Sequence, residues 1–172
     1  MTSRSERHES AGPESTPTTF NLLFVCTGNT CRSPMAAAIA ADAIRKRGWS
    51  HVRVRSAGAA AGAGAPASDL TVQVLAAHGI RLDDHASTPL TEDVVEWADA
   101  IIVMSAWQAE RVAQLGGAGK VSLASSFLPG AEASSEIPDP IGSDISVYRA
   151  TYSVLTDVVK GVLDRLEAIL AP

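Results

Sequence analysis

The stretch LLFVCTGNTCRSPM, residues 22–35, decides the fold of this chain. It opens with four large apolar residues, too few for a helix and without polar alternation, which is typical of a buried strand in a parallel sheet. After a short loop, Ser33 and Pro34 are the residue types preferred at a helix N-cap and at the first helical position. The Ala-rich segment that follows predicts a helix to Arg47, ended by Gly48.

Strand-like and helix-like segments alternate along the rest of the chain. Strands are predicted at 51–56, 100–104 and 120–124, and helices at 68–78, 91–97, 105–115 and from 145 to 169. The last helix follows an Asp144 cap, and its apolar residues recur at helical spacing. Such alternation predicts an α/β fold, a three-layer sandwich with helices on both faces of a four-stranded parallel sheet.

Length and composition define the class of protein. The chain has 172 residues, 46% of them hydrophobic, which fits one folded domain. Its net charge of -5 argues against general binding to nucleic acids or anionic membranes. Residues 1–19 lack large apolar side chains almost entirely, so we expect a flexible tail there and the domain at 20–172. No signal peptide, membrane-spanning run or disulfide framework is apparent, so we expect a cytoplasmic protein.

The chemistry expected of the quoted stretch centres on Cys26, which follows the first strand directly. Ligands bind beyond the carboxyl ends of strands in open α/β sheets, and here residues 26–31 lead into a helix N-terminus that attracts anions. Gly28 and Asn29 readily take left-handed backbone angles, so the loop can turn its N–H groups around a phosphate. Arg32 adds a guanidinium that matches phosphate oxygens. A thiol in this field ionises easily and can attack a bound phosphoryl group in line.

Cys-x5-Arg-Ser after an apolar strand resembles the active-site loop of the low-molecular-weight protein-tyrosine-phosphatase family. The longer string VCTGNTCRSPMA, residues 25–36, is similar to that family nearly position by position. Ser56-Ala57-Gly58 resembles a second motif of the family, and Asp139-Pro140 resembles its acid loop. The resemblance covers about residues 22–170 in the family's order, and it implies the fold of phosphotyrosine protein phosphatase I.

This resemblance implies a protein phosphatase that acts on phosphorylated side chains of proteins through a phosphocysteine at Cys26. Arg32 would stabilise charge on the transferring phosphoryl group, and Asp139 would protonate the leaving group and then activate water. Ser33 would hydrogen-bond the thiolate, and Asn29 would hold the loop in shape. The phosphate-binding residues would be those of the loop, Thr27, Gly28, Asn29, Thr30, Cys31 and Arg32. Free phosphate and other oxyanions would inhibit, and neither a cofactor nor a metal is implied.

Departures from the family pattern bear on the substrate. Tyrosine-directed members usually line the cleft with aromatic residues, but residues 59–64 contain only Ala and Gly, and Ile141 follows Asp-Pro. The bacterial protein arginine phosphatases are similar in having Thr at the position of Thr30, an Asp-Pro-x-Gly loop at 139–142 and the stretch at 87–91. That branch carries an aromatic residue where Ile141 stands. We therefore favour phosphoarginine over phosphotyrosine.

Other interpretations remain at this point. A thioredoxin-coupled arsenate reductase shares this loop but needs further cysteines, and none follows Cys31. A protein that only binds or carries phosphate would lack Arg32 or Asp139. Asp139 also suits an ordinary turn, and Cys31 suits core packing, a redox partnership with Cys26, or both. The spacing of Trp97 and Trp107 favours the core over the cleft.

Overall fold

The predicted alternation of strands and helices is present in the computed structural model, which describes residues 18–130 and 136–170. The strands are β1 (Phe20–Cys26), β2 (Val52–Gly58), β3 (Ala100–Val103) and β4 (Val121–Leu123). The helices are α1 (Arg32–Arg47), α2 (Asp69–Ala77), α3 (Glu92–Trp97), α4 (Ala106–Val112) and α5 (Ile145–Leu170), with short helical turns η1 (Ala113–Gly117), η2 (Ala118–Lys120) and η3 (Ala124–Phe127). All strand pairs are parallel, in the order β2-β1-β3-β4. Residues 1–17 of the expected tail lie outside the described residues.

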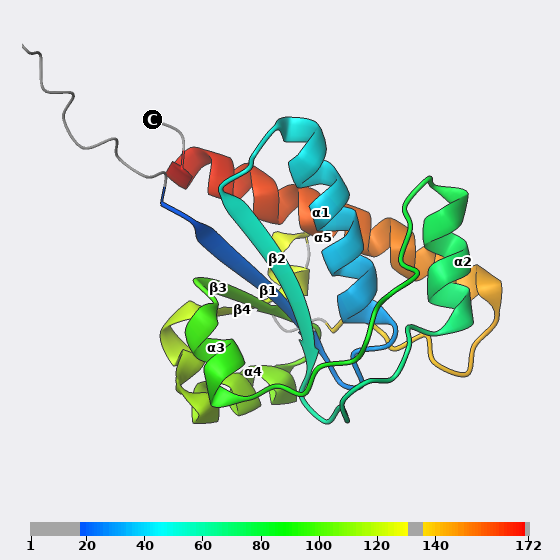
Figure 1. The fold of residues 1–172 in the computed structure, drawn as a ribbon, viewed down its shortest axis with the longest axis horizontal. Helices are drawn as coiled ribbons and strands as arrows, with labels where there is room; N and C mark the ends of the chain where they lie inside the picture. The colour runs from blue at the N-terminus through cyan, green and yellow to red at the C-terminus, as the bar shows by residue number, and fades with distance from the viewer. Residues whose placement is uncertain (1–17, 131–135, 171–172) are drawn as a thin grey trace, which may run out of the picture.

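The sheet is covered on both faces, as predicted. Successive residues of a strand point to opposite faces, and both faces of β1 are apolar. Leu22 and Phe24 pack with α1, α2 and α5, whereas Leu23 and Val25 pack with α3 and α4. Figure 1 shows α1 and α5 together on one side of the sheet and α3 and α4 on the other. This double burial explains why the strand reads as an unbroken apolar run.

Helix α5 supplies the apolar stripe that its sequence periodicity predicts. Leu155, Val159 and Leu163 are almost fully buried and belong to the same cluster as Met35 and Ile39 of α1. The long C-terminal helix therefore holds α1 against the sheet, and with it the loop that connects β1 to α1.

The prediction that both tryptophans lie in the core was wrong for one of them. Trp97 is half-buried against the α3 side of the sheet, with the Arg55 guanidinium 4.8 Å from its ring centroid. Trp107 is 45% exposed on the first turn of α4. The seven-residue helix α4 has room for few buried positions, and these are taken by Gln108 and Val112.

Candidate active site

The loop at residues 27–31 lies at the carboxyl end of β1, between its two neighbouring strands. Figure 1 shows the chain passing from β1 through this loop directly into α1. Cys26 is buried at the end of β1, opposite Gly58 of β2. A Cβ atom on Gly58 would lie 2.7 Å from the Thr27 carbonyl oxygen and 2.9 Å from the Asn29 nitrogen, so only glycine lets β2 pass this close to the loop.

Asn29 holds the shape of the loop. Its φ of 56° is the one left-handed angle of a non-glycine residue in the described part of the chain, a conformation that asparagine tolerates. Its buried amide donates to the Ser33 hydroxyl at 2.8 Å and to the Ser56 hydroxyl at 2.9 Å, and it accepts from the Thr88 N–H at 2.8 Å. Of the two residues best able to take a left-handed angle, only Asn29 does so, since the φ of Gly28 is not positive.

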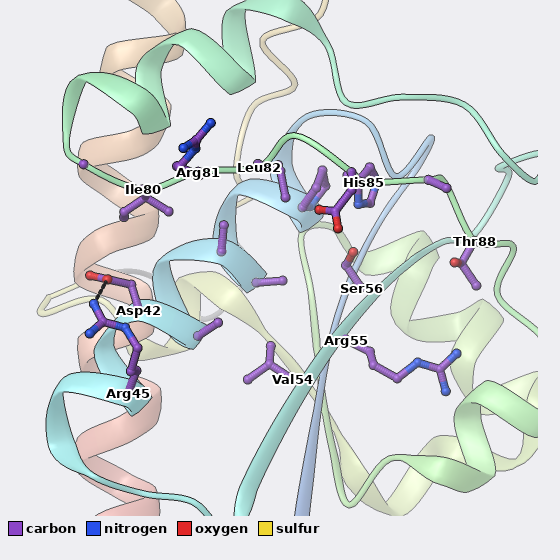
Figure 2. A pocket seen from close by; sticks show the side chains of 17 residues that line it. Asp42, Arg45, Val54, Arg55, Ser56, Ile80, Arg81, Leu82, His85 and Thr88 are labelled. Atoms are coloured by element: carbon purple, nitrogen blue, oxygen red, sulfur yellow. Dashed lines mark hydrogen bonds and ion pairs between the residues drawn. The ribbon is translucent and has the colours of Figure 1, made fainter.

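His85 secures the same loop from the backbone side, with its Nε2 2.7 Å from the Asn29 carbonyl oxygen. His85 and Ser56 both line a cavity of about 640 Å³ between α1, β2 and the segment at residues 79–88, where Figure 2 shows them close together. Cys26 is not among the described residues that line this cavity. Ser56 and His85 thus connect this cavity with Asn29 of the loop.

Ser33 contacts the thiol directly. Its Oγ is 2.9 Å from Cys26 Sγ and 3.3 Å from the Ala57 carbonyl oxygen. The Ser33 oxygen also accepts from Asn29, which leaves its single hydrogen for the sulfur or for that carbonyl. The prediction of Ser33 as a helix cap was wrong, because α1 begins at Arg32, with Cys31 as its N-cap. The hydroxyl is thereby free to act on Cys26.

The loop that follows Cys26 and the start of α1 carry hydrogen-bond donors without protein partners. Among the described residues, no acceptor binds the backbone N–H groups of residues 28–33. Arg32 is buried, and its Nη1 donates to the Ile137 carbonyl at 2.8 Å, but its buried Nε–H has no partner. Backbone N–H groups at a helix N-terminus together with an unpaired guanidinium N–H form a site for an oxyanion.

Asp139 lies next to Arg32. One carboxylate oxygen is 3.5 Å from Arg32 Nη2, and the other accepts from the Ile141 N–H at 3.1 Å. Its side chain is 40% exposed, so solvent can reach it. The turn expected at Asp-Pro is therefore present, and it leaves the second carboxylate oxygen beside Arg32.

Cys31 contacts segments beyond the loop, from before α2 and from α5. Its buried sulfur is 3.4 Å from both the Tyr148 and the Ser68 hydroxyl oxygens. Burial raises the pKa of Tyr148, and the hydrogen bond with Cys31 raises it further. Thr30 is half-buried, its hydroxyl 3.8 Å from Cys31 Sγ and its carbonyl oxygen bonded to the Ser68 N–H. Both cysteines are free thiols.

Cys26 and Arg32 flank the loop at residues 27–31, and Asp139 lies 3.5 Å from Arg32; the catalytic roles expected of the three residues stay predictions. Sequence reasoning missed the half-buried His85 and the fully buried Gln108, whose side chains reach the loop from distant segments. Gln108 had a detectable signal, because Ser105 and Gln108 have the spacing of a capping box. No sequence pattern indicated that His85 contacts the loop.

Residues 18–130 and 136–170 contain no group of three or more His, Cys, Asp or Glu side chains that could hold a metal ion. Within the same residues, no helix is both long and apolar enough to span a membrane.

Comparison with known proteins identifies the family of this fold and site. The family described as "Low molecular weight phosphotyrosine protein phosphatase" matches residues 21–170. A protein-arginine-phosphatase of Bacillus subtilis is 34% identical over 150 residues, which is 86% of this chain and 97% of that protein. Low molecular weight protein-tyrosine phosphatase A of Mycobacterium tuberculosis is also 34% identical, over 88% of this chain and 94% of that protein.

Solved structures agree with these matches. The YwlE arginine phosphatase of Geobacillus stearothermophilus has a TM-score of 0.77 at 32% identity, over 87% of this chain and 94% of that chain. A Cys-to-Ser mutant of YwlE with a phosphorylated active-site serine has a TM-score of 0.79 at 33% identity, over 86% and 96%. This chain therefore belongs to the low molecular weight phosphotyrosine protein phosphatase family and is a cysteine-dependent protein phosphatase.

Proposed function

We propose that this phosphatase removes phosphoryl groups from arginine side chains of proteins, with Cys26 as the nucleophile. The observation that carries the choice of arginine is Thr30, a polar half-buried residue of the loop whose hydroxyl has one hydrogen-bond partner among the described residues, the Cys31 thiol at 3.8 Å. The relatives that act on arginine and on tyrosine are equally similar to this chain, so overall identity does not separate the two substrates.

In the first step the Cys26 thiolate attacks phosphorus while the phosphoryl oxygens accept hydrogen bonds from the loop N–H groups and from Arg32 Nε. The S–P bond forms as the P–N bond to the guanidino group breaks. Asp139, on the exposed side of Arg32, donates its proton to the leaving nitrogen. Ser33 stabilises the thiolate by donating its hydrogen to the sulfur at 2.9 Å.

In the second step water attacks phosphorus and the S–P bond breaks. The Asp139 carboxylate takes a proton from this water, and Cys26 leaves as the thiolate, which restores the enzyme and releases inorganic phosphate. Because the product occupies the same donors as the substrate, free phosphate and similar oxyanions should inhibit competitively.

Two reduced cysteines suit a reducing compartment such as the cytoplasm.

The walls of the site support a guanidino group over a phenyl ring. The residues that follow β2, at 59–67, and those around the acid residue, at 137–143, contain no aromatic side chain. A phenyl ring would therefore lack stacking partners worth about 0.5–1.5 kcal/mol each. Asp139 presents a carboxylate at the place where a guanidinium would leave, and the Thr30 hydroxyl adds a polar group on the loop.

Two peptides of one sequence, carrying either phosphoarginine or phosphotyrosine, test the substrate. We expect a higher kcat/KM for phosphoarginine, and Thr30→Ile should reduce that preference, with Thr30→Ser as the matched control that keeps the hydroxyl. A phosphotyrosine preference that Thr30→Ile does not change would reject the arginine assignment. Cys26→Ser should abolish turnover of both peptides, and residual turnover would reject the cysteine mechanism itself.

A further inference from the structure

A buried glutamine outside the family motifs reaches the active-site loop. Gln108 of α4 is fully buried, and its Nε2 donates to the Thr27 hydroxyl oxygen at 3.2 Å. Its carbonyl oxygen accepts from the backbone N–H groups of Met104 at 2.9 Å and Ser105 at 3.2 Å. Because two N–H donors fix the oxygen end, the amide can present only its NH₂ end to Thr27.

The Thr27 hydroxyl accepts two hydrogen bonds. Besides Gln108, Arg32 Nη2 donates to the same oxygen at 3.3 Å. Neither an amide NH₂ nor a guanidinium can accept a hydrogen bond, so neither can take the hydrogen of Thr27. Both lone pairs of the oxygen are used, and no acceptor for its hydrogen is present among the described residues.

The position of the Thr27 hydroxyl indicates which group could accept its hydrogen. Thr27 follows the nucleophile Cys26 directly, and its oxygen is bonded to the guanidinium whose Nε–H is also without a partner. The hydroxyl thus belongs to the same group of donors as the N–H groups of the loop. With its lone pairs occupied, it can act only as a donor there.

We propose that the Thr27 hydroxyl donates a hydrogen bond to the phosphoryl group and that Gln108 is the positioning residue that directs it. The inference rests on the proposed reaction at Cys26 but adds two side chains to it. Gln108 occupies one lone pair and Arg32 the other, so the O–H bond is oriented before substrate arrives. Preorganised donors of this kind gain strength as negative charge grows on the phosphoryl oxygens.

Inorganic phosphate is the probe for this proposal, measured as a competitive inhibitor of the full-length enzyme. Thr27→Val keeps the side-chain volume but removes the hydroxyl, and we expect it to raise the Ki of phosphate by about tenfold to a hundredfold, the value of a hydrogen bond to a charged group. Thr27→Ser keeps the hydroxyl and should restore most of the affinity. An unchanged Ki in Thr27→Val would overturn the proposal.

The role of Gln108 is tested by a double-mutant cycle. Gln108→Met is neutral and of similar length, and we expect it to raise the Ki about threefold to tenfold when Thr27 is present and not at all in the Thr27→Val background. An equal loss in both backgrounds would show that Gln108 acts by another route and would overturn its positioning role. Gln114→Met, on the exposed side of the following turn, is the matched control and should leave the Ki unchanged.

The two proposals can fail separately. If Cys26→Ser retains turnover, the cysteine mechanism fails whatever the Thr27 variants do. If Cys26→Ser is inactive and Thr27→Val binds phosphate as the wild type does, only the further inference fails.

Discussion

Replacing Asn29 by glycine tests whether one side chain holds the active-site loop in its shape. Glycine accepts the φ of 56° without strain, so Asn29→Gly removes the hydrogen bonds to Ser33, Ser56 and Thr88 and keeps the backbone conformation. Three such bonds at about 1 kcal/mol each, with about 0.5–1 kcal/mol for the greater freedom of glycine in the unfolded chain, give a loss of about 3–4 kcal/mol. That is a large share of the roughly 5–15 kcal/mol that holds a domain folded.

The assay is urea unfolding at pH 7, with and without inorganic phosphate. At about 100 times its Kd, phosphate should stabilise the wild type by about 2.7 kcal/mol. Asn29→Gly should have a lower free energy of unfolding and should also lose most of the stabilisation by phosphate. Without the hydrogen bonds of Asn29, the loop cannot present its N–H groups together. Asn29→Ala should be less stable still, because a side chain at this φ costs about 1–2 kcal/mol.

Thr91→Ala is the matched control for this experiment. Thr91 caps α3 through the Val94 N–H at 3.3 Å, on the side of the sheet away from α1. Its loss should cost about 1 kcal/mol and leave the phosphate effect intact. If Asn29→Gly lowers the free energy of unfolding by less than about 1 kcal/mol and phosphate still stabilises the variant, the side chain of Asn29 does not hold the loop.

Three further predictions concern the packing around the site. Gly58→Ala should lower kcat/KM by about a hundredfold in a steady-state assay, because its Cβ would lie 2.7 Å from the Thr27 carbonyl oxygen. Normal activity would show that the loop can shift to accept this Cβ. Leu155→Ala should lower the free energy of unfolding in urea by about 2–5 kcal/mol, since Leu155 of α5 is fully buried in the cluster that includes α1. A loss below about 1 kcal/mol would contradict that packing. Because burial raises the pKa of Tyr148, the unfolded chain ionises first, and stability should fall above about pH 10, less so in Tyr148→Phe; identical pH profiles would reject this linkage.

The parts of the site that could be predicted from the sequence are local. Cys26, the loop and Arg32 are contiguous, and an apolar strand followed by a helix start is enough to place a thiol beside free N–H groups. Asp139 lies far away in sequence, and the resemblance of Asp-Pro to the family's acid loop identified it. The fold could also be predicted from the sequence, because each strand and helix has its own pattern of apolar residues.

The residues that sequence reasoning missed act through tertiary contacts. His85 reaches Asn29 across 56 positions of the chain, and Gln108 reaches Thr27 across 81. No local pattern encodes such a pairing, because it depends on which loops the sheet order brings together. The error at Ser33 has the same origin, since a serine at a helix start is ordinarily a cap and only the position of Cys26 gives it another partner.

Rapid-quench reaction of the wild-type enzyme with a phosphoarginine peptide shows whether Cys26 takes the phosphoryl group from arginine. Mass spectrometry of the peptide that contains both cysteines then locates the phosphoryl group. We expect it on Cys26, where it should form and decay at rates compatible with turnover. Turnover with no phosphoryl group on Cys26, or with one on another residue, would rule out Cys26 as the nucleophile.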